Sequence, residues 1–184
     1  MIGKKLVQLV AVAAALAVCA GSADAQRSRS HNANVRDGLW FSGGLGYGSL
    51  GCDGCDAREG SLSADLSVGG TLSQHWLLGV GSSAWSKTEQ GVRLTVATLD
   101  ARVRFYPSTT GGFFLTGGIG AGSMRGDVGG ISATETGVGT ILGLGWDIRV
   151  ARNASVTPYW NGFAMKNDNA DANVGQAGIA ITIH

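Results

Sequence analysis

Apolar residues recur at every second position along most of the chain from Leu39 onward. A period of two is that of a β-strand, in which successive side chains point to opposite faces. Eight segments show this alternation, and they lie at about 39–48, 61–72, 76–87, 97–105, 113–122, 138–149, 156–164 and 176–183. An even number of strands lets an antiparallel sheet close on itself and remove its edges. The pattern therefore predicts a barrel of eight strands.

Two of the segments fit less cleanly. Leu77 and Leu78 are adjacent, so the alternation does not define which face of the third segment is apolar. Pro158 lies inside the seventh segment and removes one backbone donor from its ladder. We expect short links at one end of the barrel and longer loops at the other, where residues 51–60, 126–133 and 167–173 connect the strands; the link at 88–91 is shorter.

Alternation does not by itself say which set of residues faces the barrel interior. A soluble secreted barrel of the lipocalin type would hold its apolar set inside and bind an apolar ligand there. In this chain the opposite set consists mostly of Gly, Ser and Thr, whereas a water-facing surface would be rich in Lys and Glu. Small residues suit the narrow lumen of an eight-stranded barrel. The sequence favours an all-β, eight-stranded antiparallel up-and-down transmembrane β-barrel, with the soluble barrel as the alternative.

Aromatic residues gather near the ends of these segments. If the N-terminus lies in the periplasm, they all fall at the periplasmic level of the barrel, and they are Trp40, Phe41, Trp76, Phe105, Tyr106, Phe113, Phe114, Trp146, Tyr159 and Trp160. Rings at the level of the lipid headgroups form the aromatic girdle of outer-membrane barrels. We therefore expect these residues to lie at a membrane interface.

The first 25 residues have the pattern of a secretory signal peptide. Lys4 and Lys5 precede an apolar run of about 15 residues, and Ala23 and Ala25 supply the small residues of a cleavage site before Gln26. A membrane-spanning helix needs ~20 apolar residues, so this run is too short for a membrane anchor. The predicted organisation is a signal peptide over 1–25, a flexible lead-in over 26–37 and the barrel domain over 38–184.

Composition narrows the function further. The chain has 184 residues, of which 31 are Gly and 2 are Pro, and only 15% are charged. Removal of the signal peptide leaves twelve basic and twelve acidic residues, so the mature chain is neutral. A neutral chain lacks the basic surface that nucleic-acid binding requires. We expect no nucleic-acid partner.

The Gly-rich amphipathic strands, the run Gly143-Leu144-Gly145-Trp146-Asp147 and the alternating C-terminal strand resemble the small OmpA/OmpX-like family of eight-stranded outer-membrane barrels. The resemblance covers residues 38–184. It implies an integral outer-membrane protein whose partners are outer-membrane lipid and the barrel-assembly machinery. Members of this family commonly end on an aromatic residue, whereas this chain ends with Ile183 and His184.

Six charged residues share the small-residue face that is expected to line the lumen. They are Asp65, Asp100 and Asp147 and, of opposite sign, Arg102, Arg104 and Arg149. Charges in a narrow barrel must pair or hydrogen-bond, because an unpaired buried charge costs several kcal/mol. We predict a charge-paired network that fills the lumen; a small gated ion path is the alternative.

Cys52 and Cys55 form a CxxC motif in the first loop of the longer set. A structural zinc site needs four ligands, and no second Cys or His pair accompanies the motif. Because export places the chain in an oxidising compartment, we predict a local disulfide between them. A Ca²⁺ site that uses Asp53, Asp56 and Glu59 is the alternative, and we expect no bound metal or cofactor.

The histidines argue against catalysis. His31 lies in the lead-in, His75 in a short turn and His184 at the end of the chain, so none lies where a general base at the outer leaflet would be needed. The sequence thus predicts a monomeric outer-membrane barrel with a structural or surface-contact role, which is not an enzyme. It does not identify a surface partner.

Overall fold

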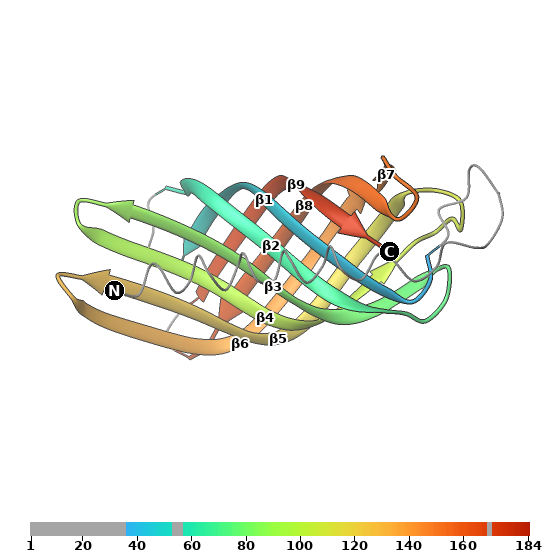
Figure 1. Cartoon of the computed structure of the whole chain (residues 1–184). Coiled ribbons are helices and arrows are strands. Elements are labelled where there is room, and N and C mark those ends of the chain that lie inside the picture. The colour runs from blue at the N-terminus through green and yellow to red at the C-terminus, as the bar shows by residue number, and fades with distance from the viewer. Residues whose placement is uncertain (1–35, 53–56, 169–170) are drawn as a thin grey trace. The chain divides into compact units, whose positions relative to one another are not determined.

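The computed structural model describes residues 36–52, 57–168 and 171–184. These residues form one antiparallel sheet in the order β6-β5-β4-β3-β2-β1-β9-β8-β7, and pairing of β6 with β8 closes the sheet (Figure 1). The strands are β1 (Leu39–Cys52), β2 (Glu59–Thr71), β3 (Trp76–Glu89), β4 (Val92–Phe105), β5 (Phe113–Val128), β6 (Ile131–Trp146), β7 (Ile148–Arg149), β8 (Ala154–Lys166) and β9 (Asp171–Ile183). The prediction of an all-β, eight-stranded antiparallel up-and-down barrel is confirmed, with eight long strands and the two-residue β7. No helix in the described ranges is long and apolar enough to cross a membrane.

The short strand β7 continues the line of β6 after an interruption at Asp147. Gly145 on β6 pairs with Tyr159, and Ile148 on β7 pairs with Val156, so the register against β8 is the same on both sides of the gap. This register places Pro158 opposite Trp146. Proline has no backbone N–H, so the seventh predicted strand tolerates Pro158 where the ladder is interrupted.

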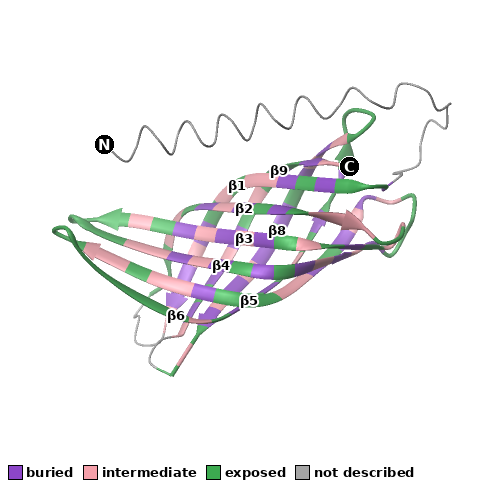
Figure 2. Ribbon diagram, turned by 60° about the horizontal axis from the view of Figure 1, so that its bottom comes forward, coloured by how far each residue is buried: buried purple, intermediate pink, exposed green. Residues whose placement is uncertain are grey.

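Side chains alternate in burial along each strand, as the bands in Figure 2 show. The outer set is apolar, with Leu45, Leu62 and Leu142 each more than 70% exposed, whereas the inner set includes Asp65, Arg102 and other polar residues at 5% or less. On β3, Leu77 is buried and Leu78 is half exposed. This shows that Leu78 belongs to the outer face of the third segment, which the sequence did not define. The apolar set faces outward, opposite to the soluble ligand-binding alternative.

The two ends of the barrel differ. We call the end where β1 begins and β9 finishes the terminal end, and the opposite end the loop end. At the loop end, β3 joins β4 through Gln90 and Gly91, whose φ angles are 49° and 82°. Gly129 and Gly130, with φ of 57° and 88°, join β5 to β6 in the same way. Two residues with positive φ are typical of a tight type I′ hairpin, so the predicted long loop at 126–133 is wrong: these strands continue nearly to the turn.

The barrel interior contains two apolar clusters. The terminal cluster consists of Trp40, Leu77, Tyr106 and Phe114. The loop-end cluster consists of Leu50, Trp85, Val96, Ile141, Phe163, Ala172 and Val174, with Leu94 and Met124 packed against it. All of its members except Ile141 occupy inward positions in the strand halves nearest the loop end. The buried charged residues of β2 and β4 lie between the two clusters in strand register.

Candidate functional site

Arg102 is the centre of a buried ion triad between the two apolar clusters. Its Nη1 lies 2.7 Å from Asp65 Oδ2, and its Nε lies 2.8 Å from Asp100 Oδ1. Ser83 Oγ donates to Asp65 at 2.7 Å and accepts from Arg102 Nη2 at 3.2 Å. The residues of this triad are at most 5% exposed. Both carboxylates thus share one guanidinium, which satisfies charges that would otherwise be destabilising inside the barrel.

Glycines make room for this triad. Gly81 on β3 pairs with Asp100 on β4 and with Ser67 on β2, so it lies between the strands that carry the charges. A Cβ atom added to Gly81 would collide with the guanidinium of Arg102. Gly118 on β5 plays the same part for Asp100, whose Oδ1 would lie 2.6 Å from an added Cβ. The lumen glycines therefore match particular long side chains on neighbouring strands.

Arg104 lies one inward position nearer the terminal end and has different contacts. Its guanidinium lies 4.5 Å from the ring centre of Trp40 and 4.8 Å from that of Phe114. Its Nη2 donates to Ser67 Oγ at 3.0 Å. Within the described residues no carboxylate lies within ion-pairing distance of it, so aromatic faces take the place of the expected ion partner.

Asp147 is the buried charged residue nearest the terminal end of the lumen. It accepts hydrogen bonds from Tyr106 Oη at 2.8 Å and Thr157 Oγ1 at 2.7 Å, and His184 Nε2 lies 3.4 Å from it. Burial by itself would raise the pKa of this carboxyl, but the hydrogen bonds from His184, Thr157 and Tyr106 and the charge of Arg104 lower the pKa below its ordinary value.

Arg149 is not buried in the lumen. The sequence placed it on the lumen face with Asp147, but it lies on β7 and is exposed. Alternation continues past the point where the barrel wall ends, and a side chain there emerges into solvent instead of a lumen.

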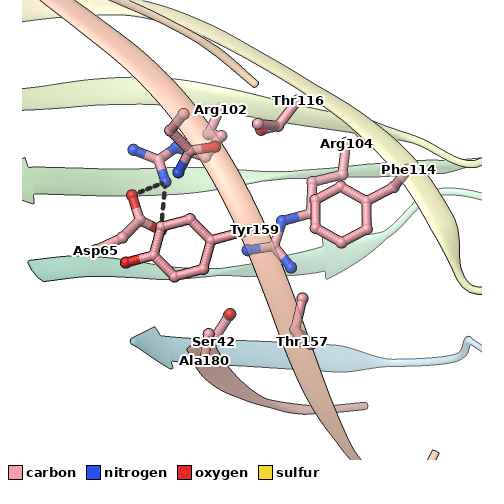
Figure 3. A pocket seen from close by; sticks show the side chains of 10 residues that line it. Ser42, Asp65, Arg102, Arg104, Phe114, Thr116, Thr157, Tyr159 and Ala180 are labelled. Carbon is pink, nitrogen blue, oxygen red and sulfur yellow. Dashed lines mark hydrogen bonds and ion pairs between the residues drawn. The ribbon is translucent and has the colours of Figure 1, made fainter. Parts of the chain in front are cut away.

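Between the ion triad and Arg104 the lumen is nearly full. A cavity of about 10 Å³ remains, and Figure 3 shows Tyr159, Arg104 and Phe114 around it. Its other lining residues are Ser42, Asp65, Arg102, Thr116, Thr157, Asn161 and Ala180. A cavity of this size has space for about one water molecule. The arrangement has no room for a substrate or an organic cofactor.

Arg36 is a buried residue that the sequence analysis missed, because it lies in the segment expected to be a flexible lead-in. Its guanidinium stacks on the Tyr106 ring, 3.5 Å from the ring centre. It donates to the carbonyl of Gly111, and to that of Gln74 at 3.2 Å. Gln74 in turn exchanges side-chain hydrogen bonds with the Arg36 backbone. No local pattern marks Arg36, since its partners are 38 or more residues away in the chain.

Six of the residues predicted for the aromatic girdle lie on the outer face. They are Phe41, Trp76, Phe105, Phe113, Trp146 and Trp160. The Trp76 and Phe105 ring centres are 4.5 Å apart, and those of Phe113 and Trp146 are 6.1 Å apart. These four rings begin or end their strands at the terminal end.

The assignment of Trp40 and Tyr106 to the membrane interface is wrong. Both are at most 1% exposed and belong to the terminal cluster in the lumen. Phe114 and Tyr159 are also buried. Neighbouring residues on a strand point to opposite faces, so only one member of each adjacent aromatic pair can face lipid.

Several predictions fall partly outside the described residues. Cys52 ends β1 and Cys55 lies outside them, so the disulfide stays a prediction. The signal peptide and most of the lead-in also lie outside. Of the proposed Ca²⁺ ligands, Glu59 forms an ion pair with Lys87. In the part of the chain that the structure describes, no group of three or more His, Cys, Asp or Glu side chains could hold a metal ion.

An apolar outer wall, a filled polar lumen and a belt of aromatic rings define a transmembrane β-barrel. Residues 10–182 match the family model described as outer membrane protein beta-barrel domain, and the chain belongs to this family. No curated protein matches the sequence.

Solved structures share the fold at low sequence identity. Neisserial surface protein A is 12% identical with a TM-score of 0.61, and the match covers 82% of this chain and 99% of that one. Ail of Yersinia pestis, crystallised with the heparin analogue sucrose octasulfate, is 14% identical with a TM-score of 0.57 over 81% of this chain and 100% of its own. The N-terminal barrel domain of Pseudomonas aeruginosa OprF is 12% identical with a TM-score of 0.50, and the match covers 81% of this chain and 100% of that domain.

Proposed function

We propose that this protein is a non-conducting, non-catalytic barrel of the outer membrane that presents an open β-sheet edge at the cell surface for contact with a partner. The terminal end then faces the periplasm and the loop end faces outward. The observation that carries the proposal is the mismatch between β6 and β8 at the loop end.

β6 extends beyond its neighbour on one side. It pairs with β5 from Ile131 to Trp146, but its pairing with β8 begins only at Val138. Among the described residues no strand pairs with residues 131–137 on the side of β8, so this stretch forms an edge there, and Ile131 is 80% exposed. Asn167 Nδ2 donates to the Thr136 carbonyl, which shows that the carbonyl of Thr136 points toward this edge. Because backbone direction alternates along a strand, Thr134 presents its N–H and C=O to the same edge.

An unpaired strand edge can accept an extended segment of another protein as an additional strand. A second copy in the same membrane does not fit, because symmetric copies are related by an axis along the membrane normal and their β6 strands rise in the same direction. A symmetric antiparallel ladder needs opposite directions. The edge therefore suits an extended polypeptide from a different molecule, and the barrel itself remains a monomer.

The charges at the loop end support a polypeptide over a polyanion. Basic and acidic side chains are nearly balanced there among the described residues: Arg58, Lys87, Arg93, Arg125 and Lys166 against Glu59, Glu89, Asp127, Glu135, Asp168 and Asp171. Lys87 is held between Glu59 and Glu89. A sulfated ligand such as the one bound to Ail would need a basic surface.

The lumen supports the non-conducting part of the proposal. The loop-end cluster and the terminal cluster lie on either side of the buried charges, and Arg36 contacts the β2–β3 and β4–β5 turns at the terminal end. A gated ion path would require both apolar clusters and Arg36 to move. Bilayer recordings of the purified protein should show no steady porin-like conductance, and such a conductance would overturn this part.

The orientation and the exposed edge are tested by labelling intact cells. In a Cys52→Ser, Cys55→Ser background, a membrane-impermeant maleimide should label Thr134→Cys and should leave Arg149→Cys unlabelled. The reverse result would exclude an outward edge.

The contact itself is tested with Thr134→Pro, which removes one edge donor but no donor of the β5 ladder. Cells that express this variant should attach less than wild type to glass coated with a reduced, unfolded polypeptide. Attachment to heparin-coated glass serves as the polyanion comparison. Equal attachment of variant and wild type to the polypeptide would contradict the proposal.

Three further expectations belong to this function. The signal peptide is cleaved before Gln26, the barrel-assembly machinery inserts the mature chain, and Cys52 and Cys55 form a disulfide in the first outer loop. N-terminal sequencing of the membrane protein and thiol counting with and without reductant test the first and the last.

A further inference from the structure

The polarity of the barrel wall inverts along β4. In the half of this strand nearest the terminal end, the outward residues are apolar and the inward ones include the buried charges. Nearer the loop end the outward residues are Thr95 and Arg93, whereas the inward residues are Val96, Leu94 and Val92. An outward residue needs an apolar side chain only where it faces lipid. The inversion therefore marks the point at which β4 leaves the apolar band.

β5 changes in the same way. Its outward residues beyond the inversion are Ser123, Arg125 and Asp127, and its inward residues there include Met124 and Val128. The β3–β4 and β5–β6 hairpins extend past the ends of β1, β2, β8 and β9 at the loop end (Figure 1). The projecting part of the sheet therefore has its apolar residues on the face that continues the barrel interior.

Three apolar side chains form one row on this inner face. Val92 pairs with Val128, and Val128 pairs with Ile131, so the three lie side by side on β4, β5 and β6. They are 42%, 54% and 80% exposed, whereas Leu94 and Met124 pack against the loop-end cluster. The row ends at the β6 edge, where its exposure is greatest. A strand added at that edge would extend the row with a side chain beside Ile131, and such cross-strand apolar pairs stabilise a sheet.

The next inward row is hollow beside the same edge. Leu94 pairs with Gly126, and Gly126 pairs with Ala133. A Cβ atom added to Gly126 would have no heavy atom within 4 Å. A bulky side chain that an added strand places beside Ala133 therefore has space over Gly126, because aromatic side chains reach past their direct cross-strand neighbour.

The outer face of the edge has the opposite character. Ser132 and Thr134 alternate with Ile131 and Ala133 on β6, and both are exposed. Residues of an added strand that lie beside these hydroxyl groups would face water. The two faces of the edge therefore require different side chains from a strand that pairs with it.

We infer that the polypeptide accepted by the β6 edge carries an apolar residue at every second position, with a bulky one beside Ala133 and polar residues between. Its apolar side chains continue the row that ends at Ile131 and fill the recess over Gly126. This inference rests on the proposed function, because it describes the partner of the same edge.

The experiment compares synthetic peptides that have one composition and different orders. In the first peptide Phe and Val alternate with Thr, and in the second the same residues are arranged with all apolar residues adjacent. Fluorescence anisotropy measures their binding to the full barrel in nanodiscs. The alternating peptide should bind about tenfold more tightly, and equal affinities would overturn the inference.

Variants locate the apolar contact. The double variant Val128→Thr, Ile131→Thr keeps the β-branched shape but removes apolar surface, and it should weaken binding of the alternating peptide by about tenfold. Val138→Thr makes the same change at an outward position of β6 that is 55% exposed, and it should leave binding unchanged. Gly126→Val fills the recess and should weaken binding of the alternating peptide more than binding of a version with Ala in place of each Phe. Equal binding by the double variant and Val138→Thr would contradict the apolar contact.

The proposed edge is tested separately from the sequence that it prefers. Thr134→Pro should weaken binding of both peptide orders, and heat-modifiable mobility on gels confirms that each variant is folded. If no peptide binds the folded wild type, the edge is wrong and this inference fails with it. If both orders bind equally and Thr134→Pro weakens both, the edge stands and only the inferred pattern fails.

Discussion

Arg102 on β4 reaches across β3 to Asp65 on β2 and donates to both of its carboxylate oxygens, at 2.9 and 2.7 Å. The crossing is possible because β3 has Gly81 where the guanidinium passes. A glycine on one strand is thus tied to an ion pair between two others. Several of the 31 glycines of the chain have such a partner inside the lumen.

Gly81→Ala should destabilise the barrel by about 1–3 kcal/mol, because the added methyl group displaces a guanidinium that two carboxylates hold in place. Gly70→Ala is the matched control, since no heavy atom lies within 4 Å of its added Cβ. Urea unfolding in lipid vesicles, followed by tryptophan fluorescence, measures both. Equal stability of the two variants would show that the triad tolerates displacement.

Arg102→Ala should lower the free energy of unfolding by about 3–5 kcal/mol, because it leaves Asp65 and Asp100 buried without a counter-charge. It should not create a large channel, since the apolar clusters on either side remain. The triple variant Asp65→Asn, Asp100→Asn, Arg102→Met should recover much of the loss. Arg125→Ala, which breaks an exposed pair with Asp127, should change stability far less than Arg102→Ala, because solvent screens exposed pairs.

Arg36→Ala should destabilise the terminal end by roughly 1.5–3 kcal/mol, the typical contribution of hydrogen bonds to a charged group. Arg36→Lys should recover only part of this, because an ammonium lacks the planar group that stacks on Tyr106. Hydrogen exchange of the turns that contain Gln74 and Gly111 should increase in both variants. Unchanged exchange would mean that Arg36 does not hold these turns.

Stability should fall at acid pH through Asp147. Its pKa in the folded barrel is below the ordinary value of 3.8. A carboxyl with a lowered folded pKa stabilises the protein above its unfolded pKa, and the stabilisation is lost as pH falls through the folded pKa. Urea titrations from about pH 5 to about pH 2 should show this decline. In Asp147→Asn the decline should be smaller, and equal slopes would exclude this carboxyl as the source.

The positions of the strands followed from the sequence because lipid and lumen impose opposite requirements on successive residues. Leu99 and Asp100 illustrate this: one is 64% exposed and the other 2%. Strand ends were harder to predict, since polar residues such as Thr134 continue a strand beyond the membrane without apolar alternation.

The candidate site was less predictable than the fold. Alternation brought Asp65, Asp100 and Arg102 to one face, but it could not say that Arg104 would stack between Trp40 and Phe114. Nor could it separate Arg149, which keeps the same phase, from the residues inside the barrel. Partner choice depends on the stagger between strands, and the loops and turns determine that stagger.

The sequence by itself determined a closed barrel with its apolar residues on the outside. Strands that alternate apolar residues with small polar ones can satisfy all their backbone hydrogen bonds in lipid only when the sheet closes. Tertiary structure alone decided which lumen residues pair, that Arg36 enters the terminal end, and that β6 extends past its pairing with β8 within the described residues. These features arise from contacts between strands far apart in the chain, and local periodicity carries no information about such contacts.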